Sequence, residues 1–501
     1  MIRVQPLASP GAGVPLEVGA RIESLRDEAR ALAERVDDLA AAAGVEPASA
    51  LSRLEVFHGY IGVFGVAFLV TLLATPLMRR LALAYGVIDR PDEARKHHRV
   101  PVAYLGGVAV FLGIIGAIVF SYVGIFTESM VGLHPSIHLG SIEPPVGAVD
   151  ALGQPVVGDP IHAMVPVSVV FGLVIIAVVG LIDDVAGIDP RLKICGQLFA
   201  AAALAYDKVG VQVATGFLAP LGKLVGHEHL LFQIPLPGPL ASLFGPSVPV
   251  DIVYWTGTAI IAICVLGACN ASNLIDGLDG LCTGVHAIAA AGLLVVALTL
   301  ALRDDGPRDA QRIILCLAVF GACLGFLPHN FNPASIFLGD CGSMLLGYCT
   351  IVVILTLGGE SGFTHMVLAG LIIYAIPIVD TVLAIVRRKL EGKSISDADD
   401  QHLHHMLKRA LGVKGAVFTL YGIAVGCATI GVMMSLWRAR VIYAVAAVSL
   451  SFMIVAAIKA ARRRAIEQQA HEGAARRPRS AKPLDPGANP PAPPEDRNAA
   501  A

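Results

Sequence analysis

Residues 163–184 read AMVPVSVVFGLVIIAVVGLIDD, an uncharged apolar run that ends in two aspartates. At a rise of about 1.5 Å per helical residue, the run is long enough to cross the roughly 30 Å hydrocarbon core of a bilayer. An ionised carboxylate is costly to hold at the end of such a run. Asp183 and Asp184 therefore indicate a functional site as well as the end of a membrane span.

The composition of the whole chain also favours a membrane protein. Of its 501 residues, 55% are hydrophobic and 15% charged, and the mean hydropathy is +0.70. Soluble domains of this size do not reach that balance. The net charge of -2 does not suggest nucleic acid as a partner. The nine cysteines lie in or beside apolar runs, so we expect no disulfide framework. Residues 1–50 do not have the pattern of a cleaved signal peptide.

The sequence predicts about eleven apolar stretches of membrane-spanning length, and hence an all-α polytopic membrane protein. The stretches are 57–78, 104–126, 163–182, 195–215, 250–269, 284–302, 311–327, 343–358, 365–386, 415–436 and 440–459. Asp207 and Lys208 interrupt the fourth, and the eighth is short, so ten spans remain an alternative.

Basic residues set the expected orientation, because they are held on the inner side of a membrane. The loop after the first span is rich in Lys and Arg, whereas the loop at 127–162 has neither. We therefore expect the first loop to lie inside. With eleven spans, the N-terminus then lies outside and the C-terminus inside.

Three parts are expected along the chain. Residues 1–54 form an N-terminal extension, in which Leu25, Leu32 and Leu39 recur at a spacing of seven. That spacing fits a short coiled coil or a single amphipathic helix equally well. Residues 55–460 form the transmembrane catalytic domain. Residues 461–501 are rich in Ala, Pro, Arg and Gly, a composition that predicts a disordered cytosolic tail.

Further acidic and amide side chains gather at the ends of other spans. Asn270, Asn273, Asp276 and Asp279 follow the fifth span, and Asp340 precedes the eighth. The orientation derived from Lys and Arg places these groups and the Asp183–Asp184 pair on the same, cytosolic side. We therefore expect one shared site.

The types of side chain at this site predict magnesium and phosphoryl chemistry. Mg²⁺ prefers oxygen ligands, and it binds through one or two carboxylates plus substrate phosphates. His402, His404 and His405 lie in a basic loop on the same side, where they are able to contact a diphosphate. Alternative interpretations are a solvated turn for each Asp pair and a zinc site for the histidines.

Five motifs in order make the chain resemble the polyprenyl-phosphate N-acetylhexosamine-1-phosphate transferases over roughly residues 60–460. The motifs are Arg95-Lys96-x-His98-x-x-Pro101 with Gly106-Gly107, Asp183-Asp184, Asn270-x-x-Asn273-x-x-Asp276-Gly277-x-Asp279-Gly280, Asn332-Pro333-Ala334 with Gly339-Asp340-x-Gly342-Ser343, and His402-x-His404-His405. Ala103 stands where many relatives of this kind have a second proline.

The resemblance implies that a polyprenyl phosphate, such as undecaprenyl phosphate, attacks a UDP-N-acetylhexosamine and releases UMP. It also implies a bacterial inner-membrane enzyme whose site faces the cytosol, with Mg²⁺ as cofactor and Mn²⁺ as a substitute. A homodimer is one hypothesis for its assembly. Because Met406-Leu407 follows the histidines, the chain looks more like the branch that uses UDP-N-acetylglucosamine to start O-antigen or teichoic acid. The phospho-N-acetylmuramoyl-pentapeptide transferases of peptidoglycan synthesis are the alternative.

Roles follow for individual residues. The expected metal ligands are Asp340 and Asp184, and the expected catalytic residues are Asp183, Asp184 and Asp279. The expected substrate-binding residues are Lys96, His98, Asn270, Asn273, Asp276, His402, His404 and His405. Direct attack by the lipid phosphate, and double displacement through an aspartyl-phosphoryl intermediate on Asp183 or Asp279, both remain open. The alternative from another class is an ion-coupled secondary transporter, whose acids would lie at the middle of the membrane.

Overall fold

Helices make up almost all of the part of the chain that the computed structural model describes. That part comprises residues 53–89, 102–126, 165–216, 218, 230–235, 247–301, 309–358, 364–390, 392 and 403–436. The heptad stretch, the tail beyond 460 and the eleventh predicted span at 440–459 lie outside it. The prediction of an all-α polytopic membrane protein is confirmed.

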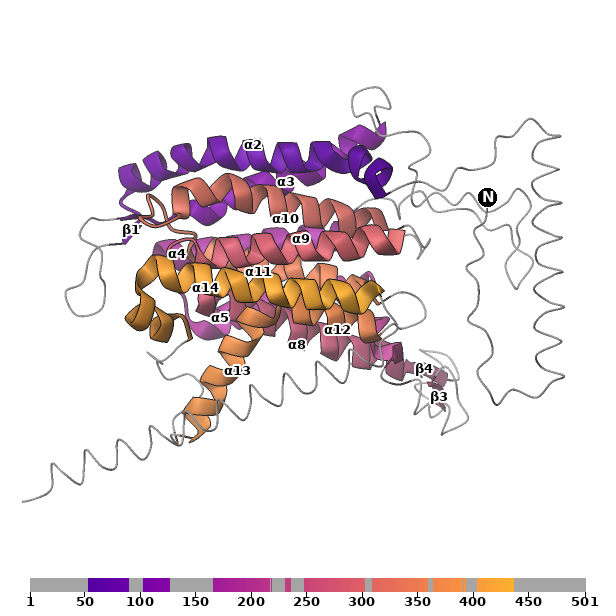
Figure 1. Cartoon of the computed structure of the whole chain (residues 1–501). Helices are drawn as coiled ribbons and strands as arrows, with labels where there is room; N and C mark the ends of the chain where they lie inside the picture. The colour runs from indigo at the N-terminus through magenta and orange to yellow at the C-terminus, as the bar shows by residue number, and fades with distance from the viewer. Residues whose placement is uncertain are drawn as a thin grey trace, which may run out of the picture. The chain divides into compact units, whose positions relative to one another are not determined.

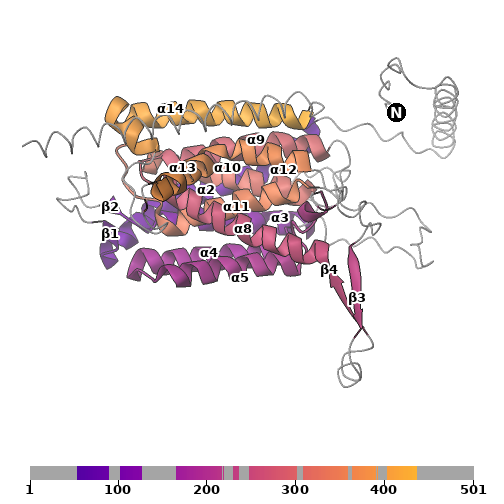
Figure 2. The same ribbon diagram turned by 90° about the horizontal axis from the view of Figure 1, so that it is seen from below.

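Eleven helices and two short hairpins follow one another along the described residues (Figure 1). The helices are α2 (Arg53–Tyr85), α3 (Gly106–Phe126), α4 (Val167–Ala186), α5 (Pro190–Tyr206), α8 (Ile252–Ile275), α9 (Leu281–Ala301), α10 (Asp309–Asn330), α11 (Gly339–Thr356), α12 (Thr364–Ile373), α13 (Ala375–Leu390) and α14 (Leu403–Leu436). The antiparallel pairs are β1 (Ile88–Asp89) with β2 (Val102–Ala103), and β3 (Leu231–Pro235) with β4 (Ser247–Asp251). The two hairpins lie at opposite ends of the bundle (Figures 1 and 2).

Eight of the described helices are long and apolar enough to cross a membrane, and the bent pair α12–α13 makes a ninth. The predicted span at 195–215 instead forms the 17-residue helix α5, which Pro190 starts and Asp207 ends. The chain turns after it because Lys208 and Gly210 have φ angles of 54° and 88°. Ten of the eleven predicted stretches are therefore helical in the described residues.

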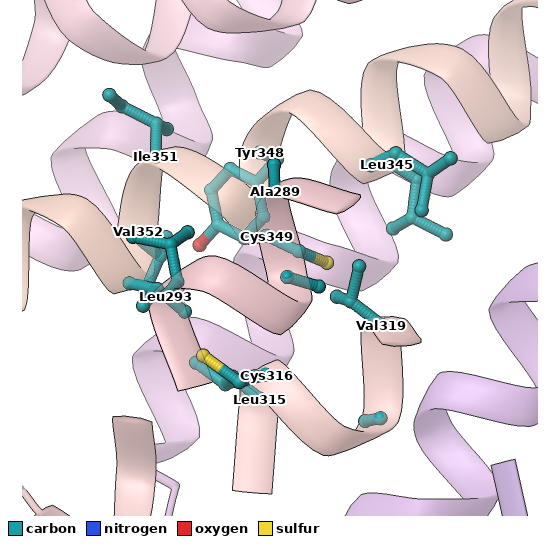
Figure 3. Close-up of a cluster of buried hydrophobic side chains, with 14 of the residues drawn as sticks. Ala289, Leu293, Leu315, Cys316, Val319, Leu345, Tyr348, Cys349, Ile351 and Val352 are labelled. Atoms are coloured by element: carbon teal, nitrogen blue, oxygen red, sulfur yellow. The ribbon is translucent and has the colours of Figure 1, made fainter. Parts of the chain in front are cut away.

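Helix α11 forms the centre of the bundle (Figure 2). In the apolar segment of α11 that is long enough to cross a membrane, 94% of the residues are buried, against 28% in the corresponding segment of α2. A helix that is apolar on every side belongs in such a position, whereas outer helices turn apolar side chains toward lipid. Figure 3 shows Tyr348 and Cys349 of α11 among side chains of α9 and α10, such as Leu293 and Val319. Neighbouring helices therefore hold α11 in place from several sides.

A sharp elbow separates α12 from α13. Only together are the two helices long enough to cross a membrane, and they meet at 80° with Tyr374 between them. Pro377 lacks the N–H that a continuous helix would donate to the carbonyl of Ile373, so the break has a local cause. Beyond the elbow α13 leaves the bundle (Figure 1).

Candidate active site

The first turn of α11 is capped by a carboxylate from another helix. Oδ1 of Asp184 accepts the Asp340 N–H at 2.8 Å, and Oδ2 accepts the Cys341 N–H at 3.0 Å. Leu338, at the N-cap position, supplies no side-chain hydrogen bond. Asp184 of α4 thus satisfies two free amides of the helix end and places negative charge at its positive end. Gly339 has a φ of 71°, which side chains with a Cβ rarely adopt, and a Cβ there would lie only 2.6 Å from Asp184 Oδ2. Both the backbone conformation and the close approach of Asp184 therefore favour glycine at this position.

Lys193 joins the carboxylates of two other helices. Its Nζ lies 2.6 Å from Asp183 Oδ2 and 2.7 Å from Asp340 Oδ2. All three side chains are mostly buried, with exposed fractions of 23%, 15% and 24% respectively. Burial strengthens such pairs relative to those on an open surface. Lys193 therefore fixes the last turn of α4 and the first turn of α11 against the start of α5.

Asn273 of α8 completes the surroundings of Asp340. Its Nδ2 donates to Asp340 Oδ1 at 2.7 Å and to Ser343 Oγ at 3.1 Å. One oxygen of Asp340 thus faces an ammonium and the other an amide. Asn270, one turn earlier, donates to Gln197 Oε1 at 2.9 Å and so links α8 to α5. The structure thus places Asn273 against an acid of the site, whereas Asn270 contacts the neighbouring helix α5.

Asp276 caps the C-terminal end of α8, and its surroundings disfavour the ionised form of its carboxyl group. Burial raises its pKa well above the ordinary value, and the negative charges of Asp340, Asp184 and Asp279 raise that pKa further. Together Asp183, Asp184, Asp276 and Asp340 form what we call the aspartate cluster. A cation bound there would offset this repulsion.

Asp279 faces the loop that leads into α11. Its Oδ2 accepts hydrogen bonds from Asn332 Nδ2 at 2.8 Å and from the Ala334 N–H at 3.1 Å. The same loop is bound from its other side, since the Phe337 N–H donates to Ala103 O at 2.8 Å. The strand β2 that carries Ala103 ends the segment containing Lys96 and His98, which both lie outside the described residues.

The histidine motif begins α14 and is held by an acid of α13. Oδ1 of Asp380 accepts the Leu403 N–H at 2.8 Å, and Oδ2 lies 3.4 Å from Nδ1 of His404. A Cβ on Gly277 would lie 2.4 Å from Nε2 of His404, so the imidazole rests against the turn that follows α8. His405 belongs to α14, but its side chain, like His402 as a whole, lies outside the described residues.

Two residues of this region, Lys193 and Asp380, were missed by the sequence interpretation. Lys193 resembles any basic residue at the inner end of a span, so the sequence holds little signal for it. Asp380 is 2% exposed inside the apolar stretch 365–386. A carboxylate in such a stretch is itself a sign of function, so this residue was recognisable.

The oxygen-rich donor set fits a hard divalent cation. No three His, Cys, Asp or Glu side chains converge as a metal site within the described residues. Mg²⁺ does not need such a set, because it keeps several waters and shares its coordination with substrate phosphates. The repulsion around Asp276 is the feature of this structure that a divalent cation would relieve.

Comparison with known proteins decides the family. A model of Glycosyl transferase family 4 matches residues 166–358. A decaprenyl-phosphate N-acetylglucosaminephosphotransferase of Mycobacterium tuberculosis is 31% identical to this chain over 354 residues, which cover 68% of this chain and 74% of the relative. The chain belongs to glycosyl transferase family 4. The resemblance inferred from the five motifs is thereby confirmed.

Two further proteins match this chain at similar levels of identity. A probable undecaprenyl-phosphate N-acetylglucosaminyl 1-phosphate transferase of Bacillus subtilis is 28% identical over 379 residues, covering 73% of this chain and 85% of the relative. A phospho-N-acetylmuramoyl-pentapeptide-transferase of Desulforudis audaxviator is 28% identical over 356 residues, covering 68% of this chain and 88% of the relative. Both branches considered from the sequence are thus represented among the relatives of this chain.

Proposed function

We propose that this chain transfers N-acetylglucosamine 1-phosphate from UDP-N-acetylglucosamine to a polyprenyl phosphate, such as undecaprenyl phosphate, and releases UMP. The observation that carries the proposal is the meeting of α4, α5, α8 and α11 at Asp340, in a chain whose relatives include polyprenyl-phosphate N-acetylglucosamine phosphotransferases. Family membership also favours an enzyme over the ion-coupled transporter.

The reaction needs cations and alignment more than covalent help. An oxygen of the lipid phosphate forms a bond to the sugar-linked phosphorus, and the bond from that phosphorus to the bridging oxygen of UMP breaks. Both reactants are anions, so the site must offset their repulsion and hold them in line. Lys193 supplies one positive charge beside Asp340. When bound, Mg²⁺ supplies the remaining positive charge to the diphosphate and to departing UMP.

Asp340 is the proposed main metal ligand. Lys193 and Asn273 fix its two oxygens, so the carboxylate has one orientation at the start of α11. Asp184 stays the second proposed ligand, through lone pairs left free by the two amides it accepts. Mn²⁺ is the proposed substitute metal.

Direct attack by the lipid phosphate is the route that the geometry favours. Asp183 is paired with Lys193, and its Oδ1 accepts the Ile188 N–H at 3.0 Å. Asp279 Oδ2 accepts two hydrogen bonds. A carboxylate engaged in this way is a weaker nucleophile, so we assign Asp183 to orienting the lipid phosphate or accepting its last proton, and Asp279 to supporting the reactive loop. Radiolabel retained on protein incubated with nucleotide sugar alone would instead indicate the aspartyl-phosphoryl route.

The remaining predicted residues are assigned to substrate. Asn270, Asn273 and Asp276 shape the nucleotide side of the site. Lys96, His98, His402, His404 and His405 contact phosphates. We place the site at the cytosolic face of the bacterial inner membrane, and a homodimer remains a proposal.

One assay tests the function and the branch together. Purified protein, polyprenyl phosphate and Mg²⁺ are supplied either with UDP-N-acetylglucosamine or with UDP-N-acetylmuramoyl-pentapeptide, and UMP is measured. We expect release from the first donor only, and only when lipid is present. Release from the second donor alone would assign the chain to the peptidoglycan branch, and release from neither would refute the proposal.

A further inference from the structure

A hydrogen-bonded group of polar side chains lies buried inside the bundle. It consists of Ser272 on α8, His286 on α9 and Tyr374 at the elbow between α12 and α13, with exposed fractions of 0%, 0% and 1%. Ser272 Oγ lies 2.9 Å from His286 Nε2, and it is hydrogen-bonded to the hydroxyl of Tyr374. None of the three has a part in the proposed reaction.

One arrangement of protons satisfies the whole group without charge. His286 Nδ1 lies 2.9 Å from Cys282 O, so it is the protonated nitrogen and Nε2 is an acceptor. Ser272 then donates to Nε2. Ser272 has no second proton, so the hydroxyl of Tyr374 is the donor in its hydrogen bond with Ser272 Oγ; Ala268 O lies 3.2 Å from the same hydroxyl. Because every group is paired, the network holds one geometry, and the loss of any member leaves a buried polar atom without its partner.

The position of this network links it to both halves of the site. Ser272 directly precedes Asn273, which binds Asp340. A Cβ on Gly347 of α11 would lie 2.5 Å from Ala268 O and 2.6 Å from Ser272 Oγ, so α11 also packs directly on the network. Helices α8 and α11, which hold Asn273 and Asp340, therefore meet the elbow residue Tyr374 at Ser272.

The other side of the elbow leads to the histidine motif. Helix α13 begins one residue after Tyr374 and carries Asp380. Asp380 binds the first amide of α14 and lies against His404, whose ring rests on Gly277. A rotation of α13 about the elbow would move Asp380, and with it His404, relative to the turn at Asp276.

We propose that Ser272, His286 and Tyr374 are positioning residues that fix the α12–α13 elbow, so that Asp380 holds His404 against the turn after α8. The network acts through Asp380 and does not touch substrate. Its effect on the reaction rests on the proposed function, whereas its effect on the elbow does not.

The first experiment measures the elbow itself. Nitroxide labels are attached at Ile263→Cys on α8 and Leu390→Cys at the end of α13, both exposed positions, after the three cysteines that are not buried are replaced by Ala. Tyr374→Phe removes only the hydroxyl. Tyr348→Phe is the matched control, since it removes an equally buried hydroxyl that bonds Val169 O.

Double electron–electron resonance gives the distribution of distances between the two labels. We expect this distribution to broaden or shift in Tyr374→Phe and to match that of the parent protein in Tyr348→Phe. Identical distributions in the parent and in Tyr374→Phe would overturn the proposal. This outcome does not depend on which substrate the enzyme uses, so it is distinct from failure of the proposed function.

The second experiment measures the consequence for catalysis. For Tyr374→Phe we expect the KM for UDP-N-acetylglucosamine to rise about fivefold with little change in kcat, because one hydrogen bond is lost at a distance from the reacting atoms. Ser272→Ala should act in the same direction.

A double-mutant cycle with Asp380→Asn then tests the route. If the elbow acts through Asp380, Tyr374→Phe should raise KM by a smaller factor in the Asp380→Asn variant than in the parent protein. Tyr348→Phe should leave KM unchanged in both backgrounds. Fold-changes of Tyr374→Phe and Asp380→Asn that simply multiply would show that Tyr374 does not work through Asp380.

Discussion

Oδ2 of Asp340 lies 2.7 Å from Nζ of Lys193, although 147 residues separate the two along the chain. The pair brings the starts of α5 and α11 together at the point where the proposed metal binds. A change at either partner should therefore affect transfer strongly while leaving the rest of the bundle in place.

Asp340→Asn keeps the size of the side chain and removes its charge. We expect UMP release to fall about 10³-fold, because a ligand to the charge-stabilising cation is lost. The amount of protein in the membrane should not change. Asp207→Asn, the same exchange at the far end of α5, serves as control and should retain activity. A rate within tenfold of wild type in Asp340→Asn would refute the metal assignment.

Lys193→Met removes the ammonium and keeps most of the apolar stem. Because Asp183 and Asp340 then face each other without a cation between them, we expect kcat/KM to fall about 10²-fold. Lys193→Arg should recover part of the loss by restoring the charge. The kinetics are compared with those of Lys208→Met, the matched exchange just beyond the same helix. Equal rates in the two Met variants would contradict a role for Lys193.

Asp276→Asn should raise the thermal stability of the protein and lower its transferase activity. The folded-state pKa of Asp276 is raised above 3.8, so its ionised form costs stability at neutral pH, and that cost disappears as the pH falls toward the unfolded value. We expect the Tm in EDTA at pH 8 to rise by about 2 °C and the difference to shrink in acid. Thermal melts at several pH values provide the measurement, and a lower Tm at pH 8 would be the contrary result.

Removal of divalent cations should stop the reaction reversibly. EDTA should abolish UMP release, and Mg²⁺ or Mn²⁺ added in excess should restore it, since both accept oxygen ligands. Recovery with Mg²⁺ is to be compared in wild type and Asp340→Asn at rising metal concentration. Full activity in EDTA would exclude the proposed cofactor.

Local sequence predicted the helices well because their signal is local. All ten apolar stretches that fall within the described residues are helical, since length and hydropathy alone decide whether a segment suits the membrane. Two details escaped. The fourth stretch forms a helix of 17 residues, and the ninth is bent by 80° where Pro377 removes a donor.

The site was predicted in part. The sequence indicated that Asp183, Asp184, Asp276 and Asp340 belong together, because each stands at the end of a span on one side. It did not indicate that Asp184 caps α11 or that Asp279 binds the Asn332 loop. Such contacts depend on which helices are neighbours, and the spacing of residues along the chain carries no record of that.

By itself the sequence determined that the chain crosses a membrane many times and carries carboxylate and amide side chains at the ends of its spans, which it predicted to form a phosphoryl-transfer site. Both follow from the cost of placing polar groups in hydrocarbon, which applies to each segment alone. The tertiary structure alone decided that Lys193 stands between Asp183 and Asp340, that Asp380 holds His404, and that Tyr374 joins the elbow to Ser272. Those choices depend on packing between helices distant in sequence, where close approach and hydrogen-bond geometry select the partners.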